Sequence, residues 1–354
     1  MKDYFVIGLM SGTSLDGLDI AYCKFTFDLH WSYNIIAFET IHYSTSFKDK
    51  LRKAPSLNTI DIGQLSNEFG LYMAQNILMF VEENSISTID LVASHGHTVF
   101  HEPNKGVTLQ IGDPQPIYEA VKVPVAYDFR TQDVALGGQG APLVPFVDSI
   151  LFNQCDACLN LGGFSNISFS SKNKRLAFDI CPVNIVLNLW ATKLGFDYDD
   201  KGSLASSGKL NLQLLDELNK LEYYSKSLPK SLGWEWVENT VIPILEKYNL
   251  AEVDIMRTFS EHVAIQMVSA FDAYSLRSVL ISGGGVYNKF IIQRMKQLSS
   301  NTLFKIEPKL IETKEAMAFA FLGLMRLKKQ NNIESSVTGA VKDHCSGKIY
   351  PEEL

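Results

Sequence analysis

The strongest constraint on the fold lies in the first 94 residues, where three apolar segments precede a helical one. Segments 5–10, 20–27 and 33–43 are rich in the β-branched and aromatic residues typical of strands, and short turns join them. Apolar residues then recur at helical spacing over 60–83, and a short apolar segment follows at 89–94. The sequence therefore predicts an antiparallel three-stranded meander, then a helix and a buried strand.

A weaker copy of this pattern begins at residue 157. Segments 157–161, 167–169 and 176–180 surround a small-residue turn, and helical stretches follow before a strand at 278–282. Strands that alternate with helices favour an α/β fold, and the order β-β-β-α-β is that of a ribonuclease-H-like lobe. At 354 residues the chain is long enough for two such lobes.

Gly and Pro residues concentrated at 135–145 predict the crossing between the lobes, with a cleft beside it. We therefore expect a first lobe of residues 1–130 plus 328–354 and a second lobe of residues 131–327. The polar segment 328–354 is expected to pack on the first lobe as a terminal helix or to fray.

Charge and composition exclude several classes of partner. The net charge of −7 leaves no basic stripe for a nucleic-acid backbone, and no apolar run is long enough to cross a membrane. The first residues lead into a strand rather than a signal region, and five cysteines do not form a disulfide framework. These features predict a cytoplasmic protein. Cys155 and Cys158 have C-x-x-C spacing, but no second pair completes a zinc site, which favours buried, inert thiols over metal or redox chemistry.

The small-residue hairpin at 8–19 carries the clearest functional signal. Its glycines let backbone N–H groups approach an anion, its Ser and Thr hydroxyls add donors, and its carboxylates can hold a metal that bridges phosphates. This pattern predicts a phosphate cradle; the alternative is a Gly-rich turn with capping side chains. Neither a P-loop nor a Rossmann motif is present.

The segment Met-Ser-Gly-Thr-Ser-Leu-Asp-Gly-Leu-Asp at 10–19 resembles the opening signature of the anhydro-N-acetylmuramic acid kinase family. Further segments resemble the family in order and spacing, and together they cover most of the chain: 94–99, 109–113, 128–130, 137–145, 160–167, 229–231, 282–285 and 315–320. The resemblance implies two ribonuclease-H-like lobes of the actin-like ATPase kind with the active site in the interlobe cleft.

The implied reaction consumes ATP, water and 1,6-anhydro-N-acetylmuramic acid and yields N-acetylmuramic acid 6-phosphate and ADP, a step of cell-wall recycling. Homodimerisation is a further expectation from the family.

The resemblance also implies roles for individual residues. Asp179 matches the family's base, which activates water. Phosphates of ATP are expected at Gly12, Thr13, Ser14, Leu15, Asp16, Gly17, Leu18 and Asp19, with Mg²⁺ at Asp16, and adenosine is expected at Gly283, Gly284 and Gly285. The sugar is expected at His97, Asp128, Arg130, Gly138, Gln139, Asn184 and Glu315.

Taken by themselves, several of these residues are equally compatible with structural roles. Asp179 can be a turn former or helix cap, and Asp128 and Arg130 can form a structural ion pair. The glycines at 283–285 can serve a tight turn, and Glu315 can be a charge favoured at a helix N-terminus. His97 and the histidines beside it lack the acidic or thiol ligands that would complete a metal site.

The sequence departs from the family pattern next to Asp179. Family members usually carry Phe-Asp-Thr-Gly-Pro-x-Asn, whereas here Ile180 and Cys181 replace the Thr and the Gly. A hydroxyl donor is lost, and a residue that disfavours positive φ replaces a glycine. Two alternatives therefore remain: a kinase of a different amino sugar or anhydrosugar, and a non-catalytic sugar- or nucleotide-binding relative. The presence of both Asp16 and Asp179 weighs against the second.

Overall fold

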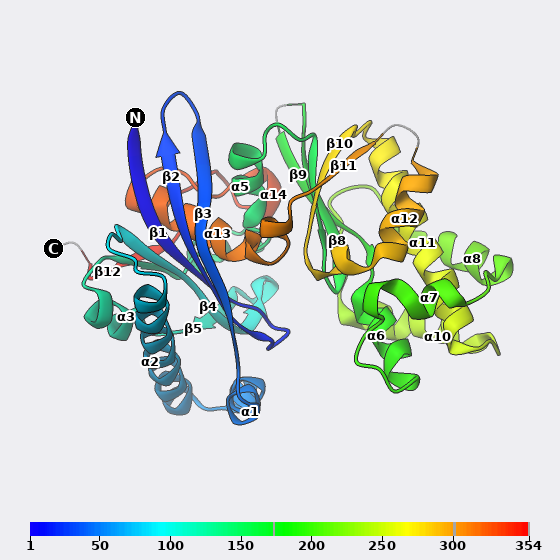
Figure 1. Cartoon of the computed structure of the whole chain (residues 1–354), viewed down its shortest axis with the longest axis horizontal. Coiled ribbons are helices and arrows are strands. Elements are labelled where there is room, and N and C mark those ends of the chain that lie inside the picture. Colours follow the sequence, from blue (N-terminus) through cyan, green and yellow to red (C-terminus); the bar gives the residue numbers. More distant parts are fainter. Residues whose placement is uncertain (173, 300–301, 353–354) are drawn as a thin grey trace. The chain divides into compact units, whose positions relative to one another are not determined.

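The computed structural model describes residues 1–172, 174–299 and 302–352, and the chain divides into two compact units (Figure 1). The first unit comprises Met1–Leu151 with Thr313–Leu354, and the second comprises Phe152–Glu312. The division falls after α5 and inside α13, whereas the sequence predicts boundaries near residues 130 and 327. Within the described residues, no helix combines the length and apolar composition that a membrane span requires.

The first unit is built on one mixed sheet. Its strands are β1 (Lys2–Ser11), β2 (Gly17–Phe27), β3 (Trp31–His42), β4 (Leu91–Glu102), β5 (Val107–Ile111), β6 (Val125–Tyr127) and β12 (Lys348–Tyr350). They are ordered β12-β6-β4-β1-β2-β3, with β5 paired to β4. Strands β1, β4 and β6 are parallel, and β2 is antiparallel to both β1 and β3. This is the ribonuclease-H-like arrangement that the sequence predicts.

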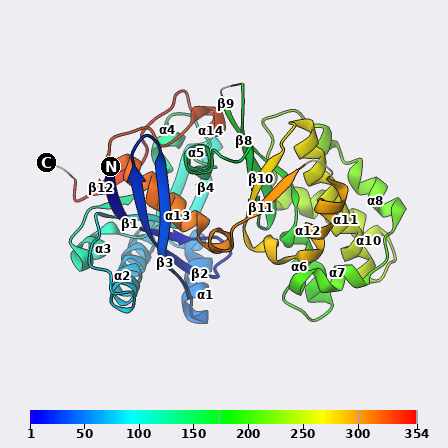
Figure 2. The same ribbon diagram turned by 45° about the horizontal axis from the view of Figure 1, so that its top comes forward.

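Helices cover both faces of this sheet (Figures 1 and 2). They are α1 (Thr45–Lys53), α2 (Thr59–Glu83), α3 (Pro114–Val121), α4 (Thr131–Ala135), α5 (Val144–Leu151), α13 (Pro308–Leu327) and α14 (Ser335–Thr338). Ile7 and Leu9 of β1 belong to the apolar cluster that α2 completes, while Gly8 between them meets the backbone of Ala316 in α13. Because side chains alternate along a strand, α2 and α13 lie on opposite faces.

Small residues explain why most of α13 belongs to the first unit. A side chain at Gly323 would collide with Ala93 of β4 and Ala126 of β6, so the helix can approach the sheet only with glycine there. The segment after α13 does not form a terminal helix. It forms the short helix α14 and then β12, which pairs antiparallel with β6 and completes the edge of the sheet.

The second unit repeats the sheet topology of the first. Its strands are β7 (Ala157–Leu161), β8 (Phe164–Ser171), β9 (Lys174–Pro182), β10 (Ser278–Ser282) and β11 (Leu303–Ile306). They are ordered β11-β10-β7-β8-β9; β8 is antiparallel to β7 and β9, and β10 is parallel to β7 and β11. The internal repeat seen in the sequence is therefore confirmed, and β9 lies at the sheet edge.

The helices of the second unit are α6 (Asn184–Lys193), α7 (Ser203–Ser207), α8 (Leu212–Asn219), α9 (Trp234–Trp236), α10 (Ile242–Lys247), α11 (Glu252–Ala273) and α12 (Lys289–Leu298). The long helix α11 is buried over most of its length, with Phe259, Met267 and Phe271 almost inaccessible to solvent. It forms the centre of one apolar core with the sheet and α6.

Candidate active site

The predicted phosphate cradle is the turn between β1 and β2. Its backbone closes through a hydrogen bond from the Leu15 N–H to the Gly12 carbonyl at 3.2 Å, and Leu15 has a positive φ of 61°. The side chains of Thr13, Ser14 and Asp16 are exposed. Two hydroxyls and one carboxylate are thus presented to solvent in one short loop.

The remaining residues of this hairpin have structural contacts. Leu18 is fully buried in the apolar core, and a side chain at Gly17 would collide with the Ile41 carbonyl in β3 at 2.5 Å. Asp19 accepts a hydrogen bond from the Thr40 hydroxyl at 2.6 Å. The hairpin therefore brings the predicted residues together. Only some of them have side chains that face outward, and the others serve the structure of the hairpin.

His97 lies on β4, buried beside the end of β1 rather than on the surface. Its Nδ1 is 3.0 Å from the Ser11 hydroxyl oxygen, which also accepts a hydrogen bond from the Tyr43 hydroxyl at 2.7 Å. Burial lowers the pKa of His97 to about 4, so the ring is neutral near pH 7. These contacts stabilise the end of β1, where the hairpin begins.

Arg130 is held by two hydrogen bonds in the first unit. Its Nη1 donates to the Gly140 carbonyl at 2.6 Å, and its Nε donates to His95 Nε2 at 2.9 Å. Burial lowers the pKa of Arg130 to about 10, while the charges of Glu315 and Asp133 act to raise it. The guanidinium therefore stays charged, and the Glu315 carboxyl, whose pKa burial raises, lies within its electrostatic range.

Asp128 forms the structural ion pair that the sequence left open. Its carboxylate lies 2.9 Å from Lys348 Nζ, and its backbone has a positive φ of 52°. The residue also lines a hollow of about 250 Å³ together with Gln110, Asp113 and Thr131.

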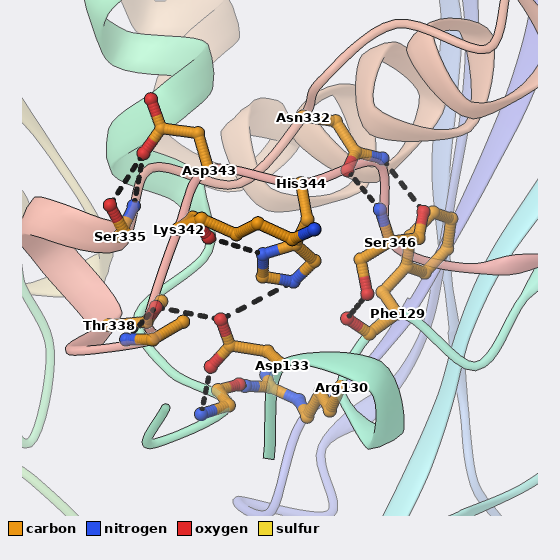
Figure 3. A network of polar contacts seen from close by, with 12 residues as sticks. Phe129, Arg130, Asp133, Asn332, Ser335, Thr338, Lys342, Asp343, His344 and Ser346 are labelled. Atoms are coloured by element: carbon orange, nitrogen blue, oxygen red, sulfur yellow. Dashed lines mark hydrogen bonds and ion pairs between the residues drawn. The ribbon is translucent and has the colours of Figure 1, made fainter. Parts of the chain in front are cut away.

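Sequence reasoning missed Asp133, which organises the loop that contains Gly138 and Gln139 (Figure 3). The Asp133 side chain is fully buried and accepts hydrogen bonds from the Gly140 N–H and the Thr338 hydroxyl, each at 2.7 Å. Thr338 lies 205 positions away in the chain, so no local pattern marks the pair. Gln139 itself is exposed, and its N–H donates to the Thr338 carbonyl at 2.7 Å.

Asp179 lies on the edge strand β9 of the second unit, half-buried. Its Oδ2 accepts a hydrogen bond from the Leu232 N–H at 2.9 Å, and its carbonyl accepts one from the Tyr223 hydroxyl at 2.5 Å. Burial raises the pKa of the Asp179 carboxyl, and the bond from Leu232 acts in the opposite direction. A carboxylate with a raised pKa is a stronger base than an ordinary aspartate, which suits proton abstraction.

The two departures next to Asp179 point into the core. A bulge follows Asp179, so that Ser165 and Asn166 of β8 face Cys181 and Asp179 while Ile180 is the extra residue. Ile180 and Cys181 are 3% and 0% exposed and belong to the apolar cluster of the second unit. Neither has a positive φ, so the expected backbone penalty at Cys181 is absent.

Asn184 opens helix α6 directly after this bulge and is half-buried. The N–H of Cys181 and its carbonyl are both bonded to the Ser165 hydroxyl, at 3.2 and 3.0 Å, which fixes the strand end before the helix. Asp179 and Asn184 are thus held at the two ends of one rigid connection.

The glycines at 283–285 follow β10 and contact the end of β7. Gly283 has a φ of 86°, and a side chain at Gly285 would lie 2.8 Å from the Leu161 carbonyl oxygen. Gly284 is exposed, and a side chain there would meet nothing within 4 Å. Two of the glycines are therefore required by packing, and Gly284 leaves its backbone open to a ligand.

Potential metal ligands do not cluster in the part of the chain that the structure describes. No group of three His, Cys, Asp or Glu side chains lies close enough there to hold an ion. Cys155 and Cys158 are both buried, as the interpretation from the sequence expects.

Known proteins similar to this chain support one family. The anhydro-N-acetylmuramic acid kinase family model matches residues 4–352. The chain is 32% identical to the anhydro-N-acetylmuramic acid kinase of Pseudomonas syringae pv. syringae (strain B728a), over 99% of this chain and 100% of that protein. It is 34% identical to that of Francisella tularensis subsp. novicida (strain U112), over 99% of both chains.

Similarity to solved structures is weaker. Component A of the (R)-2-hydroxyglutaryl-CoA dehydratase of Acidaminococcus fermentans aligns with a TM-score of 0.46 and 12% identity over 90% of this chain and 96% of that chain. This likeness is too low to bear on function. The full-length family match and the two relatives above 30% identity establish that this chain belongs to the anhydro-N-acetylmuramic acid kinase family.

Proposed function

We propose that this protein uses ATP and water to convert 1,6-anhydro-N-acetylmuramic acid into N-acetylmuramic acid 6-phosphate and ADP, a step of cell-wall recycling. Membership of the family supports the substrate class, because the match extends over residues 4–352. The observation that carries the reaction type is Asp179, a half-buried carboxylate whose pKa burial raises and which a single N–H holds in place.

Asp179 acts as the general base. It takes a proton from water, whose oxygen bonds to the anomeric carbon as the bond from that carbon to O6 breaks. The released O6 attacks the γ-phosphorus of ATP, and the bond to the β,γ-bridging oxygen breaks to leave ADP. Burial favours the first step, because it makes the neutral, protonated carboxyl more stable than it would be in water.

The β1–β2 hairpin holds the phosphates of ATP. Its exposed Thr13 and Ser14 hydroxyls and its backbone N–H groups donate to phosphate oxygens, as in other phosphate-binding loops. The exposed Asp16 carboxylate would help to hold Mg²⁺, since one carboxylate plus phosphate oxygens is a common magnesium environment. A bound ion would supply positive charge beside the transferred phosphoryl group.

The exposed backbone at Gly284 borders adenosine, because a nucleotide can lie directly against a residue that has no side chain. Packing against Leu161 at the flanking glycines keeps this turn rigid. A side chain added at Gly284 is therefore expected to weaken nucleotide binding without lowering the stability of the fold.

Arg130 recognises the lactyl carboxylate of the sugar. Its Nε and one hydrogen of Nη1 are engaged by His95 and Gly140, which orients the plane of the guanidinium and leaves its remaining donors for a ligand. The partners His95 and Gly140 are neutral, so neither of these two hydrogen bonds neutralises the positive charge.

A variant pair tests the role of Asp179. Asp179→Asn is expected to lower kcat by about 10²- to 10⁴-fold, the usual contribution of a general base, while the dissociation constant for ATP stays within twofold. Asp156→Asn is the matched control. Asp156 is also an aspartate of the second unit that accepts backbone N–H bonds, but it lies at the start of β10, at the opposite end of that strand from Gly283. Near-normal turnover of Asp179→Asn would remove Asp179 as the base.

A kinase of a different amino sugar or anhydrosugar is the second candidate, favoured by the departures at Ile180 and Cys181. Both side chains are buried in the core, which argues against an altered sugar pocket at these positions. ADP release measured across a panel of sugars decides between the two, and preference for another sugar would select the second. Saturable ligand binding with no ADP formed from any sugar would indicate a non-catalytic relative.

A further inference from the structure

The carboxylate of Asp133 joins the loop at 137–140 to the C-terminal segment of the first unit (Figure 3). Its Oδ2 accepts the Gly140 N–H and its Oδ1 accepts the Thr338 hydroxyl, each at 2.7 Å. His344 Nε2 lies 3.5 Å from the same Oδ1. A fully buried carboxylate needs the donors at Gly140 and Thr338, since an unpaired charge in the interior is strongly unfavourable.

The loop at 137–140 is shaped around this carboxylate. A side chain at Gly138 would collide with the Asp133 carboxylate, and the Gly138 N–H donates to the Asp133 carbonyl at 2.9 Å. Gly140 has a φ of 68°, a backbone conformation that other residues rarely adopt. Gly138 is therefore required by the position of the Asp133 side chain, and Gly140 by its own backbone conformation.

The loop in turn holds Arg130. The Gly140 residue donates its N–H to Asp133 and accepts Arg130 Nη1 through its carbonyl at 2.6 Å. Arg130 Nε donates to His95 Nε2, and His95 Nδ1 lies 2.9 Å from the Gly96 carbonyl, so the ring carries its proton on Nδ1. One chain of hydrogen bonds therefore runs from Asp133 to the guanidinium.

The C-terminal segment also forms hydrogen bonds to Asp133 and to residues on both sides of it. The Thr338 hydroxyl binds Asp133, and the Thr338 carbonyl accepts the Gln139 N–H at 2.7 Å. The Ser346 hydroxyl donates to the Phe129 carbonyl at 2.7 Å, next to Arg130. The segment after α13 thus fixes both ends of the stretch that carries Arg130, Gly138 and Gln139.

We propose that Asp133 is a positioning residue for the sugar. It fixes the loop at 137–140 and, through the backbone of Gly140, sets the direction in which Arg130 presents its free donors. The inference rests on the proposed function, because it takes Arg130 to bind the anionic group of the sugar. Asp133 does not touch the substrate. Its effect is exerted through the backbone of Gly140.

Asp133→Asn tests the proposal with almost no change in volume. The amide has one acceptor oxygen in place of two, so either the Gly140 N–H or the Thr338 hydroxyl must face an N–H₂ group. The KM for 1,6-anhydro-N-acetylmuramic acid is expected to rise by about 10- to 100-fold, the effect of a small displacement of a binding group. The KM for ATP is expected to stay within twofold, because the phosphate and adenosine residues lie outside this network.

Asp343→Asn is the matched control. Asp343 is a second carboxylate of the same segment; its Oδ1 accepts the Ser335 N–H at 2.8 Å and hydroxyl at 2.7 Å, and both bonds stay within the C-terminal segment (Figure 3). It is expected to leave the sugar KM unchanged. Thr338→Val is the milder second variant in case Asp133→Asn does not fold; loss of one hydrogen bond predicts a rise of about fivefold in sugar KM.

A spectroscopic measurement separates the inference from the proposed function. The ¹⁵N shift of His95 Nε2 reports its bond from Arg130, and it is expected to change in Asp133→Asn and Thr338→Val but not in Asp343→Asn. A wild-type protein that forms no product would contradict the proposed function, yet this shift would still report whether Asp133 holds Arg130. Unchanged sugar KM together with an unchanged His95 shift in the Asp133 and Thr338 variants would overturn the inference.

Discussion

Ile180 offers a sharp test of whether the departures from the family pattern alter the active site. The side chain is 3% exposed and packs in the apolar cluster of the second unit. Ile180→Val removes one methyl group and is expected to lower the free energy of unfolding by about 1 kcal/mol. Ile180→Thr has the same shape as the valine variant but buries a hydroxyl, which costs about a further 1–3 kcal/mol when it lacks a partner.

Denaturation in urea measures this difference. Three of the four tryptophans, Trp190, Trp234 and Trp236, lie in the second unit, and Trp190 is 2% exposed in the same cluster as Ile180. Their fluorescence therefore reports unfolding of this unit. With a slope of about 3 kcal/mol per molar urea, the threonine midpoint should lie roughly 0.7 M below that of the valine variant.

Equal midpoints for the two variants would refute this reasoning, because they would mean that the hydroxyl finds solvent or a partner and that position 180 does not face the core. Sugar specificity gives a second check. Both variants are expected to keep the sugar KM within about twofold of wild type, since the residue is enclosed.

Two further predictions follow from other parts of the site. The pKa of His97 is about 4 in the folded protein against 6.5 in an unfolded chain, so the unfolded state binds more protons between these values and stability should fall as pH drops from 6.5 to 4. His97→Gln should flatten that part of the thermal-unfolding profile; an unchanged profile would exclude a neutral, buried ring. Gly284→Ala should raise the KM for ATP without loss of stability, because its side chain would meet no protein atom, whereas Gly285→Ala should lower the unfolding temperature through its contact with Leu161. The reverse order of effects would remove Gly284 from the nucleotide site.

The sequence was sufficient to predict the features that depend on local patterns. Alternating apolar strands and short turns predict the meander of β1 to β3, and the glycine-rich hairpin between β1 and β2 is visible as a run of small residues. Its repeat in the second unit is detectable for the same reason.

Features that depend on distant contacts were not predictable. Strand β12 has three residues and is stabilised by pairing with β6, so its own composition does not mark it. The role of Asp133 depends on Thr338 at the far end of the chain, and the inward direction of Ile180 depends on a bulge opposite Ser165 and Asn166. A single sequence shows neither the partner nor the register.

The most direct test of the proposed reaction is product analysis in water enriched in ¹⁸O, with ATP, Mg²⁺ and 1,6-anhydro-N-acetylmuramic acid. We predict a 6-phosphate sugar with one heavy oxygen at the anomeric hydroxyl, no heavy oxygen in the phosphate, and one ADP for each sugar. A short incubation and a parallel sample of N-acetylmuramic acid 6-phosphate control for exchange at that hydroxyl. Heavy oxygen in inorganic phosphate with the anhydro ring intact would instead mean that water attacks ATP, and it would contradict the coupled reaction.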